Sequence, residues 1–250
     1  MTLPFDPGLD TTTDGFLDGR LQIIQPKAGY RAAIDPVFLA ASIRPEPGAR
    51  ILDAGAGVGT LSLCLASLCQ SPLDIYALEK QKDLHPLLIE NIKANGFQGQ
   101  ITALCGDLFD PSPDMGAFDL IVSNPPFLTA LEASASPNPI KQAANVLAQG
   151  TLADWIKACL KLLAPKGRIS LILRADSLEI ASHALAKSCG EITLTPLWPK
   201  SGQPAARIIL SARKGVKTPL RLMPGIILHQ ADGTYTQEAE AILRGGLLQT

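Results

Sequence analysis

Segments typical of strands alternate with segments typical of helices over most of this chain of 250 residues. Residues 49–55, 74–79, 100–107 and 118–124 are short, largely apolar runs of strand length, and longer helix-like stretches separate most of them. Strands that alternate with helices usually pair in parallel, because each crossover carries the chain back along the sheet. The sequence therefore predicts an α/β fold, a doubly wound, mostly parallel Rossmann-like sheet with helices on both faces.

The other expected elements are helices at 59–70, 83–96 and 152–167, and strands at 168–176, 191–199 and 206–214. The last two strands are so close in sequence that they predict an antiparallel pair, which gives the sheet an antiparallel final strand. We expect three parts: an N-terminal arm with a helix at 1–45, a main α/β domain at 46–214 and a C-terminal tail at 215–250.

Composition restricts the class of protein. Hydrophobic residues make up 46% of the chain, yet none of the apolar runs approaches the roughly 20 residues of a membrane-spanning helix, so no membrane association is expected. The N-terminus has no basic start followed by an apolar stretch, which argues against a signal peptide. Five cysteines without CxxC spacing and three scattered histidines favour a cytoplasmic protein with reduced thiols and no metal.

Positive charge is concentrated in one part of the sequence. The stretch from Lys200 to Arg221 contains six basic residues and no Asp or Glu, so its net charge is +6. Because the net charge of the whole chain is −1, the remaining residues carry −7. The six basic residues are Lys200, Arg207, Arg213, Lys214, Lys217 and Arg221. Such segregation indicates either a polyanionic partner or a solvated strand and loop.

The end of the first strand carries the sequence DAGAGVG. Asp53 ends the strand, and Gly55, Gly57 and Gly59 form the turn into the next helix, where a ligand can approach a backbone that lacks Cβ atoms. The spacing is G-x-G-x-G, whereas dinucleotide-binding dehydrogenases have G-x-G-x-x-G. Because Asp53 repels a pyrophosphate at close range, the turn favours a ligand with a cationic group.

Acidic residues also end the next two strands. Glu79 is placed to bind both hydroxyls of a ribose, and Asp107 is placed to accept a hydrogen bond from an adenine amine. Ligands of open α/β sheets bind outside the carboxyl ends of the strands, so these side chains are expected to share one site. A ribose, an adenine and a cationic sulfonium together describe S-adenosylmethionine.

The fourth strand ends in SNPPF, residues 123–127. The prolines fix φ near −65° and hold the preceding residue extended, so Asn124 Oδ1 and the Pro125 carbonyl are expected to stay in place as two acceptors. An amine that becomes positive during methyl transfer would be stabilised by both acceptors. Pro126 completes the rigid turn, and Phe127 offers a ring on which a base can stack.

These motifs in this order resemble the class I S-adenosylmethionine-dependent methyltransferases, and Asn-Pro-Pro-aromatic resembles the branch that methylates exocyclic or amide nitrogens. The flanks at 14–41, 196–215 and 225–246 resemble the bacterial tRNA adenine-N6 methyltransferases that act on an anticodon-loop adenosine of a valine tRNA. This resemblance implies tRNA as the partner, bound through the six basic residues. In place of the short basic stretch with His that such proteins carry, residues 138–155 have Lys141 and no His.

Alternatives remain at this point. A glutamine amide of a protein, or a small molecule, satisfies the same two acceptors, and a non-catalytic RNA-binding module is disfavoured because Asp53, the glycines and Asn124 are all present. Asp35 is interpreted as a helix cap or a residue that closes the cofactor pocket. Tyr30 and Arg31 lie where an arm would cover the cofactor, whereas Trp155, Trp198 and Tyr235 are interpreted as packing residues.

Overall fold

The computed structural model describes residues 10–28, 31–126 and 151–248. Within these residues nine strands form one sheet, and two further strands form a separate hairpin. Along the chain, the elements are β1 (Thr11–Phe16), β2 (Leu21–Pro26), α1 (Asp35–Ala41), β3 (Arg50–Ala54), α2 (Thr60–Leu68), β4 (Asp74–Glu79), α3 (His85–Ala94), β5 (Ile101–Cys105), β6 (Phe118–Ser123), α6 (Leu152–Leu162), β7 (Leu163–Arg174), α7 (Leu178–Ala186), β8 (Cys189–Lys200), β9 (Arg207–Lys214), β10 (Arg221–Leu222), β11 (Ile226–His229) and α8 (Gln237–Leu243).

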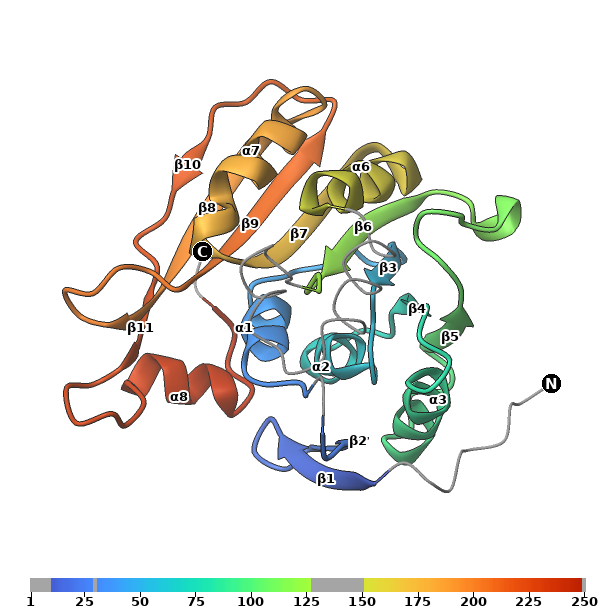
Figure 1. Cartoon of the computed structure of the whole chain (residues 1–250), viewed down its shortest axis with the longest axis horizontal. Coiled ribbons are helices and arrows are strands. Elements are labelled where there is room, and N and C mark those ends of the chain that lie inside the picture. The colour runs from blue at the N-terminus through green and yellow to red at the C-terminus, as the bar shows by residue number, and fades with distance from the viewer. Residues whose placement is uncertain (1–9, 29–30, 127–150, 249–250) are drawn as a thin grey trace, which may run out of the picture.

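The large sheet has the order β10-β8-β9-β7-β6-β3-β4-β5, and β11 pairs with β8 (Figure 1). All of its pairs are parallel except those made by β9, which runs antiparallel to both β7 and β8. The predicted fold class and the antiparallel pair are therefore confirmed. Because β9 is inserted between β7 and β8, the parallel strands keep their carboxyl ends at one edge of the sheet.

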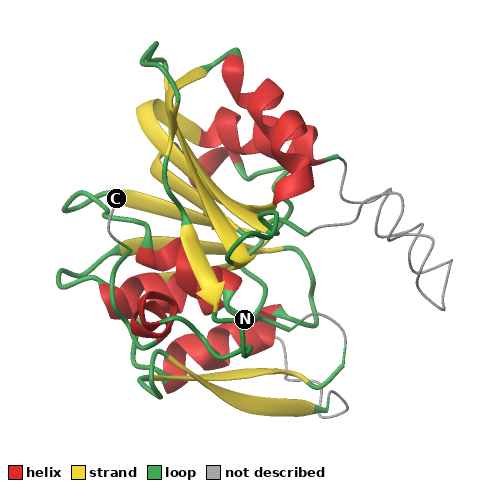
Figure 2. Ribbon diagram, turned by 90° about the vertical axis from the view of Figure 1, so that its left-hand side faces the viewer, coloured by secondary structure: helices red, strands yellow, loops and turns green. Residues whose placement is uncertain are grey.

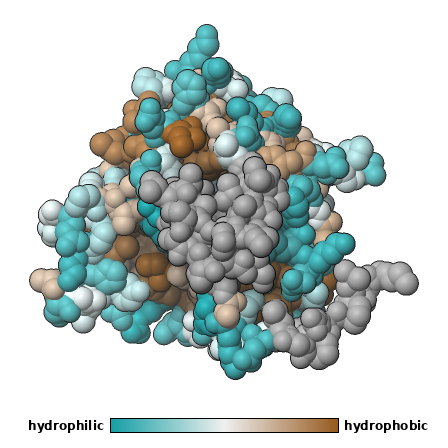
Figure 3. All heavy atoms as spheres, in the orientation of Figure 1, coloured by the Kyte–Doolittle hydropathy of each residue, from teal (hydrophilic) through white to brown (hydrophobic). Residues whose placement is uncertain are grey.

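Helices cover both faces of the sheet (Figure 2). Side chains alternate along β3, so Ile51 packs with α1, α2, α3 and α8, whereas Leu52 and Ala54 pack with α6 and α7 on the other face. These two apolar clusters hold the sheet between its helices and so support the residues at the ends of the strands. On the outer face seen in Figure 3, charged and polar side chains predominate, with hydrophobic ones between them.

The boundary between α6 and β7 differs from the prediction. The helix expected to run to residue 167 ends at Leu162, and β7 begins at Leu163 rather than at residue 168. Pro165 disfavours helical geometry at the residue before it, and Lys166 follows with a φ of +66°. The pairing with β6 shifts register there, so the residues that were expected to end the helix form an irregular start to the strand.

Two parts of the chain outside 46–214 contain more structure than expected. Residues 10–28 contain the hairpin β1–β2, and the tail contributes β10 and β11 to the sheet and α8 to its lower face in Figure 1. Leu21 of the hairpin and Ile242 of α8 belong to the same apolar cluster as α1 and α2. The division into an arm, a main α/β domain and a tail stays a prediction.

Candidate active site

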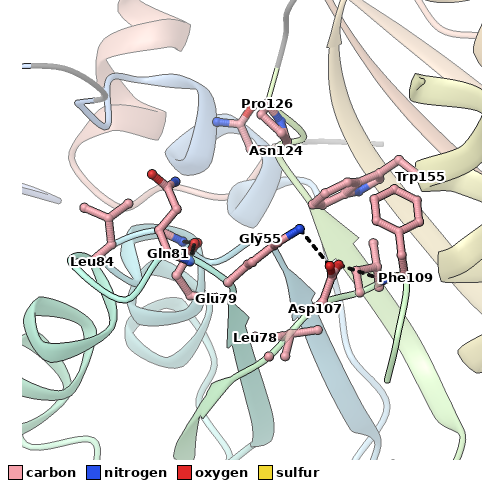
Figure 4. A pocket seen from close by; sticks show the side chains of 14 residues that line it. Gly55, Leu78, Glu79, Gln81, Leu84, Asp107, Phe109, Asn124, Pro126 and Trp155 are labelled. Atoms are coloured by element: carbon pink, nitrogen blue, oxygen red, sulfur yellow. Dashed lines mark hydrogen bonds and ion pairs between the residues drawn. The ribbon is translucent and has the colours of Figure 1, made fainter. Parts of the chain in front are cut away.

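A pocket opens at the carboxyl ends of β3, β4, β5 and β6. Six of the residues that the sequence nominated line it: Gly55, Gly57, Glu79, Asp107, Asn124 and Pro126. In Figure 4, Trp155 and Phe109 lie on one side of the pocket, and Glu79 and Gln81 lie on the opposite side. The structure thus brings the ends of four strands together around one space, the position at which open α/β sheets bind ligands.

The glycine turn after β3 forms the floor of this pocket. Gly55, Gly57 and Gly59 have φ values of +75°, +58° and +89°, which side chains rarely adopt. The Gly55 and Ala56 N–H groups both donate to the Leu78 carbonyl at 2.9 Å, which ties the turn to β4. A Cβ at Gly55 would lie 3.0 Å from two ring atoms of Trp155, so glycine is needed here for packing as well as for φ.

Gly59 belongs to the same turn but does not line the pocket. A Cβ at this position would lie 2.5 Å from Cδ1 of Leu88 on α3. A side chain here would have to displace the end of Leu88, and the φ of +89° favours glycine, so Gly59 shapes the turn from behind.

Glu79 is buried at the end of β4, with 4% of its surface exposed. Its Oε2 accepts a hydrogen bond from the Gly57 N–H at 2.7 Å, and its Oε1 accepts one from the Gln81 N–H at 2.6 Å. Each carboxylate oxygen has two lone-pair sites, so both retain capacity for a further donor. Glu79 therefore fixes the glycine turn and also presents acceptors to the pocket.

Asp53 lies beneath the glycine turn and does not line the pocket. It is 1% exposed, and its Oδ2 accepts hydrogen bonds from Ser62 N at 3.1 Å and Ser62 Oγ at 2.7 Å. Burial raises the pKa of Asp53 to about 7, although the two bonds from Ser62 oppose this shift. Asp53 thus joins β3 to the first turn of α2, and its role in cofactor binding stays a prediction.

Asp107 lines the pocket and is already paired. Its Oδ2 lies 2.7 Å from Nζ of Lys80, and its Oδ1 accepts a hydrogen bond from the Phe109 N–H at 3.0 Å. Burial, the largest influence, raises the pKa of Asp107, but the hydrogen bonds from Lys80 and Phe109 outweigh it and lower the pKa below its usual value. Asp107 is thus held as an ionised acceptor.

Asn124 stands at the end of β6, half-buried, with its Oδ1 shielded from solvent. The residue before it is locked, because Ser123 Oγ donates to the Ala54 carbonyl at 2.6 Å and accepts from Trp155 Nε1 at 3.1 Å. Pro125 is buried and does not line the pocket, whereas Pro126 is exposed and does. Phe127 lies outside the described residues, as do Tyr30 and Lys141.

Sequence reasoning missed much of the apolar wall. Trp155 was interpreted as a packing residue, but its ring lines the pocket while its Nε1 anchors it to β6. Phe109 meets it edge to face, with ring centroids 6.0 Å apart. The other lining residues that were not nominated are Leu78, Lys80, Gln81, Leu84, Gly106 and Leu108. Thr151 and Asp154 form a capping box, a sequence signal that places Trp155 in the first turn of α6.

A match to a family model identifies the class of protein to which this pocket belongs. The model described as "Methyltransferase small domain" matches residues 32–177, more than half of the chain. The chain belongs to the methyltransferase small-domain family. The methyltransferase identity expected from the strand-end motifs is therefore confirmed.

Relatives of this methyltransferase extend the match to its flanks. A protein of Actinobacillus pleuropneumoniae serotype 5b (strain L20), named tRNA1(Val) (adenine(37)-N6)-methyltransferase, is 30% identical over 228 residues, which cover 91% of this chain and 94% of its own. A protein of the same name from Parabacteroides distasonis (strain ATCC 8503) is 31% identical over 176 residues, which cover 68% of this chain and 73% of its own.

A solved structure agrees on the fold. A crystal structure described as a predicted O-methyltransferase from Agrobacterium tumefaciens matches this methyltransferase with a TM-score of 0.71 at 20% identity, covering 86% of this chain and 98% of that one.

The basic residues of this methyltransferase do not form one cluster. Lys200 and Arg207 lie at the carboxyl edge of the sheet, where β8 ends and β9 begins. Arg213 and Lys214 lie at the opposite edge, where β9 ends beside the start of β8. Lys217 is exposed three residues beyond β9, and Arg221 in β10 pairs with Thr193, in the first half of β8. The six residues therefore do not share one edge of the sheet, because the antiparallel strand β9 carries charge from one edge to the other.

Several of these cations already have partners within the protein. Arg207 Nε lies 2.9 Å from Oδ2 of Asp35, so Asp35 joins α1 to β9 and makes no side-chain cap of its helix. Lys200 Nζ donates to the Ala231 carbonyl at 2.9 Å, and Lys214 Nζ donates to two carbonyls at the end of α6. Arg31 binds Asp14 of the hairpin at 2.8 Å. Their roles toward RNA or a cofactor stay predictions.

The remaining expectations concern metals, thiols and membranes. All five cysteines are free thiols. No group of three or more His, Cys, Asp or Glu side chains suited to a metal ion occurs in ranges 10–28, 31–126 and 151–248. Among the helices of these ranges, none has the length and apolar character needed to cross a membrane.

Proposed function

We propose that this methyltransferase transfers a methyl group from S-adenosylmethionine to the exocyclic N6 of an adenosine in tRNA, in the anticodon loop of a valine tRNA. The observation that carries the proposal is the juxtaposition of Asn124 and Pro126 with the pocket formed by the glycine turn, Glu79 and Asp107. The names of the relatives, which specify N6 of adenine 37 in tRNA1(Val), supply the substrate.

The acceptor groups and the apolar wall of the pocket suit S-adenosylmethionine. Glu79 retains acceptor capacity on both oxygens for a pair of ribose hydroxyls, and ionised Asp107 accepts from an adenine amine. Leu78, Leu108, Phe109 and Trp155 supply an apolar wall for the adenine ring. Gly55 and Gly57 leave room for the amino-acid portion to approach the backbone, since neither has a side chain.

When bound, S-adenosylmethionine supplies a methyl group on a positively charged sulfur. The protein's part is to hold the acceptor nitrogen in line with that group, which supplies much of the rate through proximity. Asn124 Oδ1 and the Pro125 carbonyl each accept a hydrogen bond from one N–H of the N6 amine. Both hydrogen bonds become stronger as the nitrogen gains positive charge. Transfer would break the bond between the methyl carbon and the sulfur, which leaves as a neutral thioether, and the positive nitrogen would then lose a proton to water, so no residue has to remove a proton before transfer.

The structure supports fixed acceptors at this position. Ser123 is hydrogen-bonded to β3 and to Trp155, and two prolines follow Asn124, so the turn is rigid before a substrate enters. Preorganised acceptors need no reorganisation during the reaction. An adenosine in a single-stranded loop reaches such a pocket by leaving its stack.

The test is to identify the methylated product. The purified protein is incubated with methyl-labelled S-adenosylmethionine and small RNA from a strain that lacks the gene, and the RNA is digested to nucleosides. We expect label in N6-methyladenosine from the anticodon loop of a valine tRNA. Label in another nucleoside would overturn the proposed substrate, and absence of any transfer to RNA would overturn the proposed reaction.

A further inference from the structure

A buried asparagine joins the N-terminal hairpin to the glycine turn. Asn91 on α3 is fully buried. Its Oδ1 accepts from the Ile24 N–H at 2.8 Å, and its Nδ2 donates to the Ile24 carbonyl at 2.8 Å and to the Val58 carbonyl at 2.9 Å. Ile24 belongs to β2, and Val58 lies between Gly57 and Gly59.

The orientation of this amide is fixed. Both hydrogens of Nδ2 are donated to carbonyls, and Oδ1 faces an N–H group, so a flipped amide would set an oxygen against two carbonyl oxygens. Val58 is 1% exposed, so the Asn91 bond satisfies a buried carbonyl of the turn. Loss of this bond leaves that carbonyl buried without its donor, which destabilises the observed turn.

Asn95, one helical turn later, makes the same contacts with the hairpin. Its Oδ1 accepts from the Gln22 N–H at 2.9 Å and its Nδ2 donates to the Gln22 carbonyl at 2.8 Å. Four residues of a helix rise about 6 Å, close to the roughly 6.6 Å between alternate residues of a strand. The two asparagines therefore bind β2 much as a neighbouring strand would, but Asn91 alone of the two contacts the turn.

The turn is the part of the pocket that Asn91 governs. The Gly57 N–H, one residue before Val58, is bound by Glu79, and Gly57 itself lines the pocket. The Val58 carbonyl is thus held from the α3 side, while the Gly57 N–H is held from β4. These two bonds fix the peptide groups of the turn that a ligand would approach.

Resting on the proposed binding of S-adenosylmethionine to this pocket, we infer that Asn91 is a positioning residue for the methyl donor: it holds the glycine turn in its binding shape and couples the turn to the docked hairpin. Coupling is reciprocal, so a ligand that stabilises the turn also stabilises the docked hairpin. The hairpin is then a part of the binding apparatus although it does not line the pocket.

The first experiment compares Asn91→Ala with Asn95→Ala. Both substitutions remove two hydrogen bonds to β2, so both are expected to lower the urea midpoint of unfolding. Calorimetry with S-adenosylmethionine is expected to show binding about tenfold weaker or more for Asn91→Ala, and a clearly smaller loss for Asn95→Ala, which loosens the hairpin but keeps the bond to the turn. At saturating S-adenosylmethionine, kcat of Asn91→Ala is expected to stay close to the wild-type value.

The second experiment uses the wild-type protein, so it does not depend on the folding of a variant. Hydrogen exchange of the β2 amides is measured with and without S-adenosylmethionine, and slower exchange is expected when it is bound. If wild-type protein binds S-adenosylmethionine but both variants bind it equally well, or β2 exchange is unchanged, the inference about Asn91 is wrong. If the wild-type protein does not bind S-adenosylmethionine at all, the proposed function fails and the inference fails with it.

Discussion

At the scale of single residues, ionisation of the buried Asp53 carboxyl is expected to lower the free energy of unfolding. Burial raises its pKa from 3.8 to about 7, so between these values the folded protein keeps a proton that the unfolded chain has released. The contribution of the protonated Asp53 carboxyl to stability is therefore fully present below pH of about 4, and it is lost as the pH rises through about 7. Asp53→Asn keeps an oxygen for the two bonds from Ser62 and cannot ionise.

We expect Asp53→Asn to be more stable than wild type at pH 8 and to unfold at a higher urea concentration. The expected gain in the free energy of unfolding is on the order of a few kcal/mol, since each pKa unit corresponds to about 1.4 kcal/mol. The difference should shrink toward pH 4. Urea denaturation of the ligand-free proteins from pH 4 to pH 8 measures it, and a difference that does not change with pH would show that Asp53 is already ionised in the folded protein.

The residues of the site were predictable where they end strands. Gly55, Gly57, Glu79 and Asp107 follow apolar runs, and parallel strands deliver their carboxyl ends to one edge, so the sequence implied their proximity. The direction of a side chain at the edge was not predictable. Asp53 turns back under the glycine turn to Ser62, and Lys80 reaches Asp107, because each finds a partner supplied by the assembled fold.

At the scale of elements, the glycine turn after β3 combines unusual φ values with close packing. Gly55→Ala places a Cβ at a φ of +75° and 3.0 Å from the Trp155 ring. Gly48→Ala is a matched control, since Gly48 has a φ of +76° and a Cβ added to it would have no heavy atom within 4 Å. Each substitution incurs the cost of a left-handed backbone, about 1–2 kcal/mol per residue.

We expect Gly48→Ala to lower the free energy of unfolding by about 1–2 kcal/mol and to leave the affinity for S-adenosylmethionine unchanged. Gly55→Ala should lose more stability and bind S-adenosylmethionine at least about tenfold more weakly, because the Trp155 wall has to move. Urea denaturation and calorimetry give the two quantities. Equal losses in both variants would mean that the contact with Trp155 has no part in the pocket.

The regular elements were mostly predicted from the sequence, but the hairpin, which has a sequence signal, and the tail strands, which have none, were missed. Residues 11–26 contain two strand-like runs around the turn formed by Leu17, Asp18 and Gly19, all at positive φ, and an Asp-Gly pair there is a known hairpin signal. β10 has two residues and β11 has four, too few for a period to be read. They form because β8 offers an edge with which to pair.

At the scale of the whole molecule, basic residues occupy both edges of the sheet, and only one edge contains the pocket. An RNA whose base enters the pocket meets the carboxyl edge, where Lys200 lies, while Arg221 lies beside the first half of β8. Each phosphate that loses its cationic partner removes about 0.7–0.9 from the slope of log affinity against log salt.

We expect Lys200→Ala to weaken tRNA binding and to lower its salt slope by about one, whereas Arg221→Ala changes neither. Filter binding of a valine tRNA over a range of salt concentrations measures both effects. The reverse result, with Arg221 and not Lys200 setting the slope, would place the RNA at the edge opposite the pocket.

Asn124 gives the sharpest test of the proposed chemistry, because its side chain is expected to serve the reacting nitrogen and not the methyl donor. Calorimetry with S-adenosylmethionine and single-turnover methylation of a valine tRNA are measured for wild type and Asn124→Ala. We expect nearly unchanged S-adenosylmethionine affinity and a methyl-transfer rate lower by about 100-fold or more. An unchanged transfer rate, or a loss confined to S-adenosylmethionine binding, would show that Asn124 does not hold the acceptor nitrogen.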